Sequence, residues 1–346
     1  MPEGHAVERW LHRTGAARVI ARRYGGRGVI FMLHSVVEDA EPYLREPIRC
    51  TKGVLELLLR YLRARQIDIV SLDDALRRFS DPNGPRFAVL TFDDGYRDNL
   101  TRALPMLERY AAPATIYVTT CLIERTANAW WLGLVEWLKR REWIALEGYG
   151  RRTTRTLAEK VGARIGLTRW VQADETRIAA LSRAMAHDRV CCRSLLDQQM
   201  LQAEELRRLA DHPLITIGGH TTSHPWLAAL SETAALREIA ENRSYLQDLT
   251  QQEVAHFAYP FGSALACTER EAALVAAAGF RTAATARHGC VFPGHDEERY
   301  ALPREGVQWH DDEASLACKS IGARRFLRDL KLGQPWRAPI ATMAGP

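Results

Sequence analysis

Two adjacent carboxylates stand at the end of an apolar run in this sequence. Residues 87–90 are apolar and are followed by Thr91, Phe92, Asp93, Asp94 and Gly95, so the acidic pair lies where a buried strand is expected to end. Neighbouring residues of a strand point to opposite faces, and both carboxylates reach one pocket only if the chain turns after them. Gly95 supplies that turn, because it adopts backbone angles that other residues avoid. A solvated surface turn is the alternative for this motif alone.

Two histidines far downstream form the second candidate motif. His220 and His224 have the spacing of a helical HExxH zinc site, but Thr221 stands where that motif has its catalytic Glu. Pro225 also disfavours helical angles at His224. Residues 214–218 are predicted to be a short buried strand, so the histidines are expected in the loop that follows it. Two histidines in a polar loop without a ligand are the alternative.

Together, the two motifs supply the ligands of a catalytic metal site. One Asp and two His leave positions open on a divalent ion for water and substrate. Such an ion lowers the pKa of a bound water and polarises a carbonyl oxygen, while a nearby carboxylate accepts the proton of the water. Zn²⁺ is the expected cofactor, and Co²⁺, Ni²⁺ or Fe²⁺ suit the same ligands. These residue types therefore predict metal-dependent hydrolysis.

Three motifs follow one another in the order TFDDGYRDN (91–99), GGHTTSHPWL (218–227) and FAYPFG (257–262). They resemble the polysaccharide deacetylases with a nodulation protein B homology domain, which form carbohydrate esterase family four, over about residues 27–125 and 203–305. The resemblance implies that Asp93 is the catalytic base and that Asp94, His220 and His224 hold the metal. It also implies removal of N-acetyl groups from amino-sugar oligosaccharides or polysaccharides by a distorted (β/α)7-type barrel.

The third motif departs from the pattern of the family. An Arg that braces the catalytic base commonly opens it, but this sequence has Ala258 there, and Arg304 is the predicted replacement. The resemblance places a backbone N–H that binds the oxyanion at Phe261, and Tyr259 belongs to the same substrate-contacting motif. A turn with core aromatic residues is the alternative for this motif.

The general acid is a further departure. Many family members carry it in a Leu-x-His motif near the C-terminus, which is not found in this sequence. One branch, similar to the biofilm poly-N-acetylglucosamine deacetylases, carries the His on an early strand, and GVIFMLHSV (28–36) has that form. His34 is therefore the predicted acid, and a capping or core histidine at a strand end is the alternative. His310 and His256 are the next candidates.

Short apolar runs alternate with helical patterns, as is typical of a parallel α/β sheet or barrel. Strands are predicted at 29–33, 67–72, 87–92, 115–119, 214–218 and 256–259. Helices are predicted at 51–65, 99–110, 203–211, 231–249 and 268–278. The acidic and histidine motifs then both follow strands, which is the catalytic face of a parallel barrel.

Residues 124–202 interrupt this alternation and are predicted to form an inserted, mostly helical subdomain near the mouth of the barrel. The segment contains Trp130, Trp131, Trp137, Trp143 and Trp170. Tryptophans stack well on sugar rings and could line a substrate path, although core packing is their more frequent use. The predicted organisation is an N-terminal basic helix (1–26), the deacetylase barrel (27–123 and 203–310), this insertion and a C-terminal helical tail (311–346).

Charge and cysteine content exclude other classes of function. The net charge is +5, but 42 acidic residues are spread among the basic ones and no nucleic-acid-binding motif accompanies them, so no nucleic-acid partner is expected. Seven scattered cysteines fit neither a disulfide framework nor CxxC metal spacing. The N-terminal stretch lacks the apolar core of a signal peptide, and no apolar run is long enough to span a bilayer. A cytoplasmic protein is therefore expected.

A cytoplasmic location favours an N-acetylated oligosaccharide or a lipid-linked glycan as the partner over an exported polymer. Val7, Trp10, Leu11 and Ile20, with interleaved arginines, and residues 324–331 could form basic amphipathic helices that rest on the inner face of the membrane. Packing of both helices on the domain is the alternative. Two other functions stay open, namely a deformylase or O-acyl esterase acting on a lipid-linked sugar, and a catalytically inactive carbohydrate-binding protein.

Overall fold

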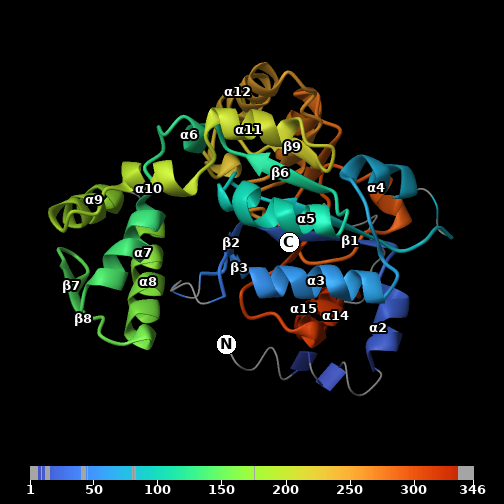
Figure 1. Ribbon diagram of the computed structural model, residues 1–346, viewed down its shortest axis with the longest axis horizontal. Coiled ribbons are helices and arrows are strands. Elements are labelled where there is room, and N and C mark those ends of the chain that lie inside the picture. The colour runs from blue at the N-terminus through green and yellow to red at the C-terminus, as the bar shows by residue number, and fades with distance from the viewer. Residues whose placement is uncertain are drawn as a thin grey trace.

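The computed structural model describes residues 7–8, 10–11, 16–39, 44, 46–79, 81, 83–174 and 176–333, and within them eight parallel strands form one curled central sheet (Figure 1). The strands are β1 (Gly28–Leu33), β4 (Asp68–Ile69), β5 (Phe87–Phe92), β6 (Ala114–Val118), β9 (Ile215–Gly219), β10 (His256–Ala258), β11 (Thr282–Ala284) and β12 (Glu305–Gly306). Their order is β11–β10–β9–β6–β5–β1–β12, and β4 pairs with the start of β5.

A short segment joins the two edges of this sheet. Leu302 forms a parallel bridge with Ala284 at the end of β11, and Glu305 and Gly306 of β12 pair with β1. Because this segment bridges to β11 at Leu302 and forms the opposite edge strand β12 three residues later, the sheet curls into a distorted barrel. The predicted (β/α)7-type fold is confirmed.

The core of the barrel comes from the apolar runs that predicted its strands. All six residues of β5 are buried, as expected for a strand covered on both faces. Helices on the outside are α3 (Lys52–Ala64), α4 (Leu72–Phe79), α5 (Leu104–Arg109), α11 (Ala203–Ala210), α12 (Glu232–Thr250), α13 (Glu269–Ala277) and α14 (Glu313–Ser320). Thr51 and Ser231 cap α3 and α12 by accepting hydrogen bonds from the N–H groups of Val54 and Ala234.

Two predicted elements differ in detail from those observed. The strand expected at 67–72 is shortened to β4, because Ser71 accepts a hydrogen bond from the Asp74 N–H and α4 already begins at Leu72. The helix expected at 99–110 opens with a π-helical turn, η1 (Asn99–Ala103), before α5. Outside the barrel sheet, β2 (Ser35–Val37) and β3 (Arg49–Thr51) form a separate parallel pair.

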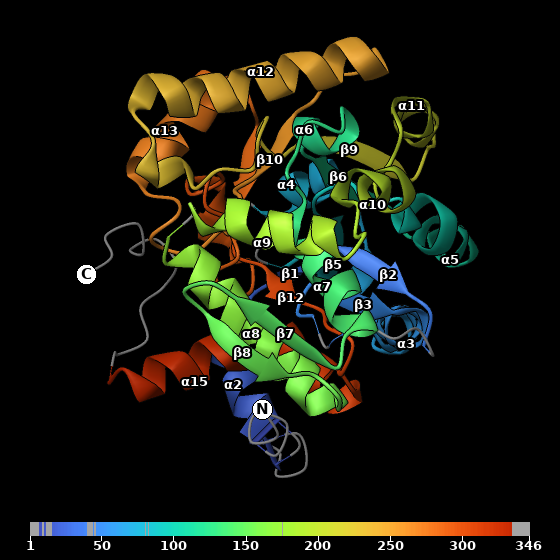
Figure 2. The ribbon, with the colours of Figure 1, turned by 90° about the vertical axis from the view of Figure 1, so that its left-hand side faces the viewer.

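Residues between α6 (Thr120–Ile123) and α11 form the insertion, which lies apart from the barrel helices in Figure 1 and faces the viewer in Figure 2. Its elements are α7 (Trp130–Arg140), β7 (Trp143–Leu146), β8 (Gly150–Thr153), α8 (Leu157–Gln172), α9 (Arg177–His187) and α10 (Cys192–Gln199). The antiparallel β7–β8 hairpin is an exception to the mostly helical content that the sequence predicts. The insertion packs around its own apolar cluster, which includes Leu132, Leu167 and Leu181.

Arg125 fastens the two ends of the insertion to each other. Its buried guanidinium group donates to the carbonyl oxygens of Leu122, Met200 and Leu201, and its Nε lies 3.1 Å from a carboxylate oxygen of Asp197. The chain therefore leaves the barrel and returns to it at nearly the same place.

The tryptophans of the insertion serve mainly in packing. Trp137 is buried, and Trp130, Trp131 and Trp170 are partly buried against the same apolar cluster. Trp143 is 42% exposed, and the guanidinium carbon of Arg151 lies 4.5 Å from the centre of one of its rings. Core packing is thus the use observed for most of these side chains.

The terminal helices pack against each other. Leu11 and Ile20 are buried in a cluster with Cys318 and Ala323, at the junction of α2 (Ala16–Tyr24) with α14 and α15 (Ala323–Lys331). These two predicted membrane-facing side chains therefore point into the protein, as the packing alternative expects. Val7 and Trp10 are exposed. The other parts of the predicted terminal helices, 1–6, 9, 12–15 and 334–346, lie outside the described residues.

Among the residues that the structure describes, no helix has both the length and the apolar character needed to cross a membrane. All seven cysteines carry free thiols.

Candidate active site

The carboxyl ends of β1, β5 and β9 bring the predicted catalytic residues together. β1 and β5 pair residue by residue up to Leu33 and Phe92, and the Asp93 N–H donates to the Leu33 carbonyl at 2.9 Å. His34 and Asp93 therefore follow their strands side by side. His220 follows β9, and β6 lies between β9 and β5 in the sheet and pairs with both. Because all these strands are parallel, their ends lie at the same mouth of the barrel.

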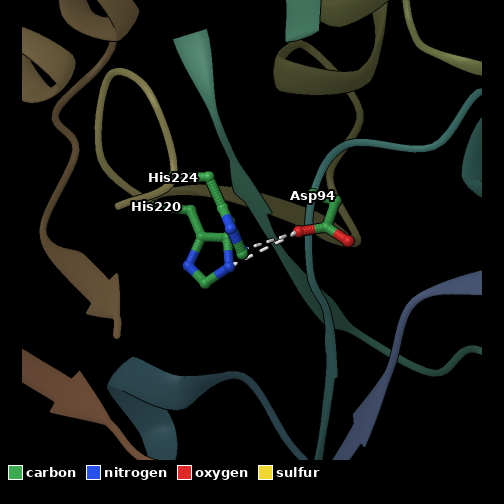
Figure 3. Close-up of side chains that lie close together, drawn as sticks. All are labelled: Asp94, His220 and His224. Atoms are coloured by element: carbon green, nitrogen blue, oxygen red, sulfur yellow. Dashed lines mark ion pairs between the residues drawn. The ribbon is translucent and has the colours of Figure 1, made fainter. Parts of the chain in front are cut away.

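Asp94, His220 and His224 form a cluster of three potential metal ligands (Figure 3). Their ligand atoms lie within 4.8 Å of one another, and the Nε2 atoms of both histidines lie 3.5 Å from the same carboxylate oxygen of Asp94. Two imidazoles and one carboxylate converging on one point are a donor set that suits Zn²⁺ and similar divalent ions. The predicted ligands are thus brought together by the fold.

The backbone at this cluster takes unusual conformations. Asp94, Thr221, His224 and Phe261 have φ values of 75°, 66°, 59° and 62°. Positive φ is uncommon for residues other than Gly and costs about 1–3 kcal/mol at each position, so the surrounding contacts must hold it. The turn after β5 begins at Asp94 and continues through Gly95, one residue earlier than the sequence alone indicates. This conformation lets two neighbouring carboxylates serve one site.

Backbone and side-chain contacts orient His220. Its Nδ1 lies 2.7 Å from the carbonyl oxygen of Ala258, so an Nδ1–H donates there and Nε2 is left to face Asp94. Burial opposes a charged ring, but the carboxylates of Asp94 and Asp93 raise the pKa of His220 above its ordinary value. A divalent cation between these residues would replace the proton that His220 and Asp94 otherwise share.

The other two ligands are held in the charge states that a cation requires. Desolvation lowers the pKa of His224 to about 4 despite the nearby Asp94 carboxylate, so its ring is neutral at pH 7. Burial tends to raise the pKa of Asp94, but its hydrogen bond with His220 and the nearby imidazoles of His34 and His224 lower it. A neutral imidazole and an ionised carboxylate are the forms that bind metal.

Asp93 is paired with Arg304 in the interior of the barrel. The Arg304 guanidinium donates two hydrogen bonds to the two carboxylate oxygens of Asp93, at 2.7 and 2.8 Å, and both side chains are buried. Burial alone would raise the pKa of Asp93, but the charge of Arg304, together with His220 and His34, lowers it. The carboxylate is therefore ionised at neutral pH, as a base must be. The predicted proximity of Arg304 to Asp93 is thus observed.

His34 also lies close to Asp93. Its Nε2 is 4.0 Å from a carboxylate oxygen of Asp93, and its side chain is 18% exposed. The Asn99 side-chain amide donates to the His34 carbonyl at 2.7 Å, which fixes the backbone there. His256, by contrast, lies at the start of β10 with its Nε2 3.3 Å from Asp73, at the other end of the barrel. His34 is therefore placed better than His256 to reach the reacting group.

A model of the polysaccharide deacetylase family matches residues 80–283, which is more than half of the chain and includes the acidic and histidine motifs. The chain belongs to the polysaccharide deacetylase family. The match identifies the protein as a hydrolase of the N-deacetylase type, and comparison with the curated proteins gives no match.

Solved structures share the fold of this deacetylase. Streptococcus pyogenes deacetylase PplD in complex with acetate is similar with a TM-score of 0.56 and 15% identity, over 84% of this chain and 97% of that chain. IcaB from Ammonifex degensii has a TM-score of 0.56 and 16% identity, over 86% and 98%. The BpsB deacetylase domain from Bordetella bronchiseptica has a TM-score of 0.53 and 15% identity, over 83% and 98%. At these identities, the similarity shows a common fold.

Small side chains make room for Arg304 in the interior of the deacetylase barrel. Its guanidinium carbon lies 5.6 Å from the ring centre of Tyr117, and Tyr117 packs with Ala258 and Ala284. Arg304 Nε also donates to the Thr285 carbonyl. Ala258 stands where the family usually has an Arg. Its small side chain packs against Tyr117, over whose ring the guanidinium of Arg304 lies.

The structure divides the third motif into a core residue and a site residue. Tyr259 is 1% exposed, and its hydroxyl donates to the Tyr300 carbonyl at 2.9 Å. Its side chain is therefore part of the core, and the predicted substrate contact by Tyr259 is wrong. Phe261, in contrast, is 51% exposed and meets the His224 ring edge-on at 5.0 Å. Its backbone N–H donates to no acceptor among the described residues and remains available to an oxyanion.

Asn242 is a site residue that the sequence analysis did not identify. From the buried face of α12, its side chain accepts a hydrogen bond from the His220 N–H at 2.9 Å and donates to the Val118 carbonyl and the Thr120 hydroxyl. It thereby ties the ends of β6 and β9 together at His220. The sequence did contain one indication of this role. Asn242 is a polar residue that falls on the same face of the predicted helix as the apolar positions 235, 239 and 246.

Proposed function

We propose that this deacetylase is a metal-dependent hydrolase that removes N-acetyl groups from amino-sugar oligosaccharides or polysaccharides. The observation that carries the proposal is the arrangement of the two carboxylates. Asp93 is held by Arg304, while Asp94 faces two histidine nitrogens at 3.5 Å. One carboxylate is thus free of the ligand cluster and suited to act as a base, and the other belongs to the cluster.

The ligand cluster fits a divalent cation, with Zn²⁺ as the expected ion and Co²⁺, Ni²⁺ or Fe²⁺ as alternatives. Asp94, His220 and His224 would hold it, with the Ala258 carbonyl fixing the orientation of His220. When bound, such an ion lowers the pKa of a water and polarises the carbonyl of the acyl group. Three protein ligands leave positions for both the water and the substrate.

The residues of the chain divide the proton transfers between them. Asp93 accepts a proton from the attacking water, and the Arg304 guanidinium keeps Asp93 oriented and ionised before each cycle. The Phe261 N–H donates a hydrogen bond to the oxyanion that forms on the acyl carbon. His34, near Asp93, donates a proton to the departing amine. The products are acetate and a free amino sugar.

Other observations favour N-deacetylation over the two alternatives. The family assignment and the fold shared with PplD, IcaB and BpsB support a sugar substrate. The de-N-acetylase from Aggregatibacter actinomycetemcomitans also has a similar fold, with a TM-score of 0.53 and 12% identity. A protein that only binds carbohydrate needs no base, so the buried Asp93–Arg304 pair argues against lost activity.

The test is acetate release from N-acetylglucosamine oligomers by protein stripped with a chelator and reloaded with each metal. We expect activity only with metal, and we expect Asp93→Asn to lose about 10²–10⁴-fold in kcat while its metal content is unchanged. Release of formate from N-formyl sugars, or of an alcohol from O-acyl sugars, in preference to acetate would assign the alternative enzymes. A metal-loaded protein without activity on any acylated sugar would contradict the proposal.

A further inference from the structure

An exposed aromatic pair adjoins the ligand cluster. Trp226 is 43% exposed and Phe261 is 51% exposed, and their ring centres are 5.8 Å apart with an angle of 30° between the planes. Phe261 also meets the His224 ring, whose Nε2 lies 3.5 Å from Asp94. A continuous series of contacts therefore leads from the candidate metal ligands through Phe261 to Trp226.

Both rings are fixed although they face solvent. The Trp226 indole N–H donates to the Leu265 carbonyl at 3.1 Å, which satisfies its polar atom and leaves the ring faces for apolar contacts. The left-handed backbone of Phe261 is held in a tight turn in which the Gly262 N–H donates to the Pro260 carbonyl. A rigid aromatic surface loses little entropy when a ligand binds to it.

Packing among the described residues does not explain why this surface is exposed. Leu265, whose carbonyl holds Trp226, is itself 73% exposed, so three large apolar side chains face solvent close together. Adjoining exposed apolar groups commonly mark a binding site. The position beside the ligand cluster indicates that the ligand of this surface is the substrate.

We propose that Trp226 and Phe261 form a sugar-binding subsite, which holds the sugar residue next to the one that is deacetylated. The flat faces of aromatic rings pack against the C–H faces of pyranose rings. The inference rests on the proposed function, and it adds which side chains hold the neighbouring sugar and so favour a chain over a single sugar. A single N-acetylated sugar fills only the position at the ligand cluster.

The test compares Trp226→Ala, Trp226→Phe and the control Trp143→Ala. Trp143 is a matched control because it is 42% exposed and lies on β7 of the insertion. Acetate release is measured on N-acetylglucosamine and its dimer to pentamer. For Trp226→Ala we expect kcat/KM to fall about 3- to 10-fold on the oligomers, mainly through KM, and to stay unchanged on the single sugar. Trp226→Phe should recover most of the loss, and Trp143→Ala should match the unmodified protein at every length.

Equal kinetics of Trp226→Ala and the unmodified protein at every length would overturn the subsite, as would an equal loss on the single sugar and the oligomers. If the proposed function is wrong, the result differs, because the unmodified protein then releases no acetate from the single sugar or from any oligomer. In that case, calorimetric titration with the pentamer still decides the subsite. Weaker binding by Trp226→Ala than by Trp143→Ala supports it, and equal binding refutes it.

Discussion

The mouth of the barrel and the insertion use charged side chains in opposite ways. At the mouth, Asp93, Arg304 and His220 are buried and come from three separate parts of the sequence. In the insertion, the pairs Arg140–Glu136 and Arg177–Asp174 join neighbours in sequence, and their side chains are partly exposed. Buried charges depend strongly on their partners, whereas exposed pairs contribute little to stability. A single substitution is therefore expected to change chemistry at the mouth and to change only packing in the insertion.

The largest effect is expected from loss of a ligand at the mouth. His220→Ala removes one of three converging donors and leaves Asp94 without its buried partner. We expect loss of bound metal and a fall in kcat/KM of at least about 10³-fold, since a metal ion supplies several kcal/mol of transition-state stabilisation. Metal content by atomic absorption and acetate release check it.

The control for His220→Ala is a histidine of the insertion. His187→Ala alters a side chain that is 89% exposed on α9, and both metal content and activity should be unchanged. A metal-loaded and active His220→Ala protein would contradict this prediction, because the mouth would then tolerate loss of a buried side chain as the insertion tolerates loss of an exposed one.

The next effect concerns the partner of the base. Arg304 lowers the pKa of Asp93 against the effect of burial, so Arg304→Met should raise that pKa by about 1–3 units. The acid limb of the profile of kcat/KM against pH should shift to higher pH, because a protonated Asp93 cannot accept a proton. Activity on the acid limb should fall about 10- to 100-fold, because each unit by which the pKa rises reduces the ionised fraction there about tenfold, and it should recover as the pH rises above the shifted pKa.

Two other variants make the pH experiment decisive. Arg304→Lys keeps the charge but loses the paired hydrogen bonds, so its acid limb should lie between those of the unmodified protein and of Arg304→Met. Arg140→Met, in an exposed pair of the insertion, should leave the profile unchanged. An unmoved acid limb in folded Arg304→Met would show that Arg304 does not hold Asp93 ionised.

The smallest effect on activity is expected from the core of the insertion. Leu167 on α8 is fully buried there, and Leu167→Ala should destabilise the insertion by about 2–5 kcal/mol in urea unfolding. Acetate release from the single sugar at 25 °C should stay within about 2-fold, because the insertion packs around its own core. A large loss of activity with intact metal content would show that the insertion takes part in the reaction.

Much of the barrel could be predicted because its strands are continuous apolar runs. β5 has the predicted bounds, and β1, β6 and β9 lie within one residue of theirs. β11 and β12 were not predicted, because three and two residues carry no periodic signal and their pairing depends on distant strands. The β7–β8 hairpin was not predicted either, because the four residues of β7 are all apolar and show no alternation in the sequence, although exposed and buried residues alternate along the folded strand.

The site residues could be predicted where they belong to a motif with several specific residue types in a fixed order. Asp94, His220 and His224 converge as the motifs indicate. Because position 258 is Ala instead of the usual Arg, another Arg was expected beside Asp93, and Arg304 is that residue. The burial of Tyr259, which was assigned to the substrate-contacting motif, could not be predicted, because the direction of a side chain after a strand depends on backbone turns such as that at Phe261. The cytoplasmic location and a lipid-linked glycan stay predictions.

The position of Arg304 on the segment that bridges the two edges of the sheet links catalysis to the integrity of the barrel. Leu302 and Glu305, on either side of Arg304, are the residues that pair with β11 and β1. Any local opening that detaches this segment also withdraws the guanidinium from Asp93 and leaves that carboxylate without its cation. Such an opening would inactivate the enzyme without global unfolding, and hydrogen exchange at the amides of 302–306 would report the fraction of open molecules.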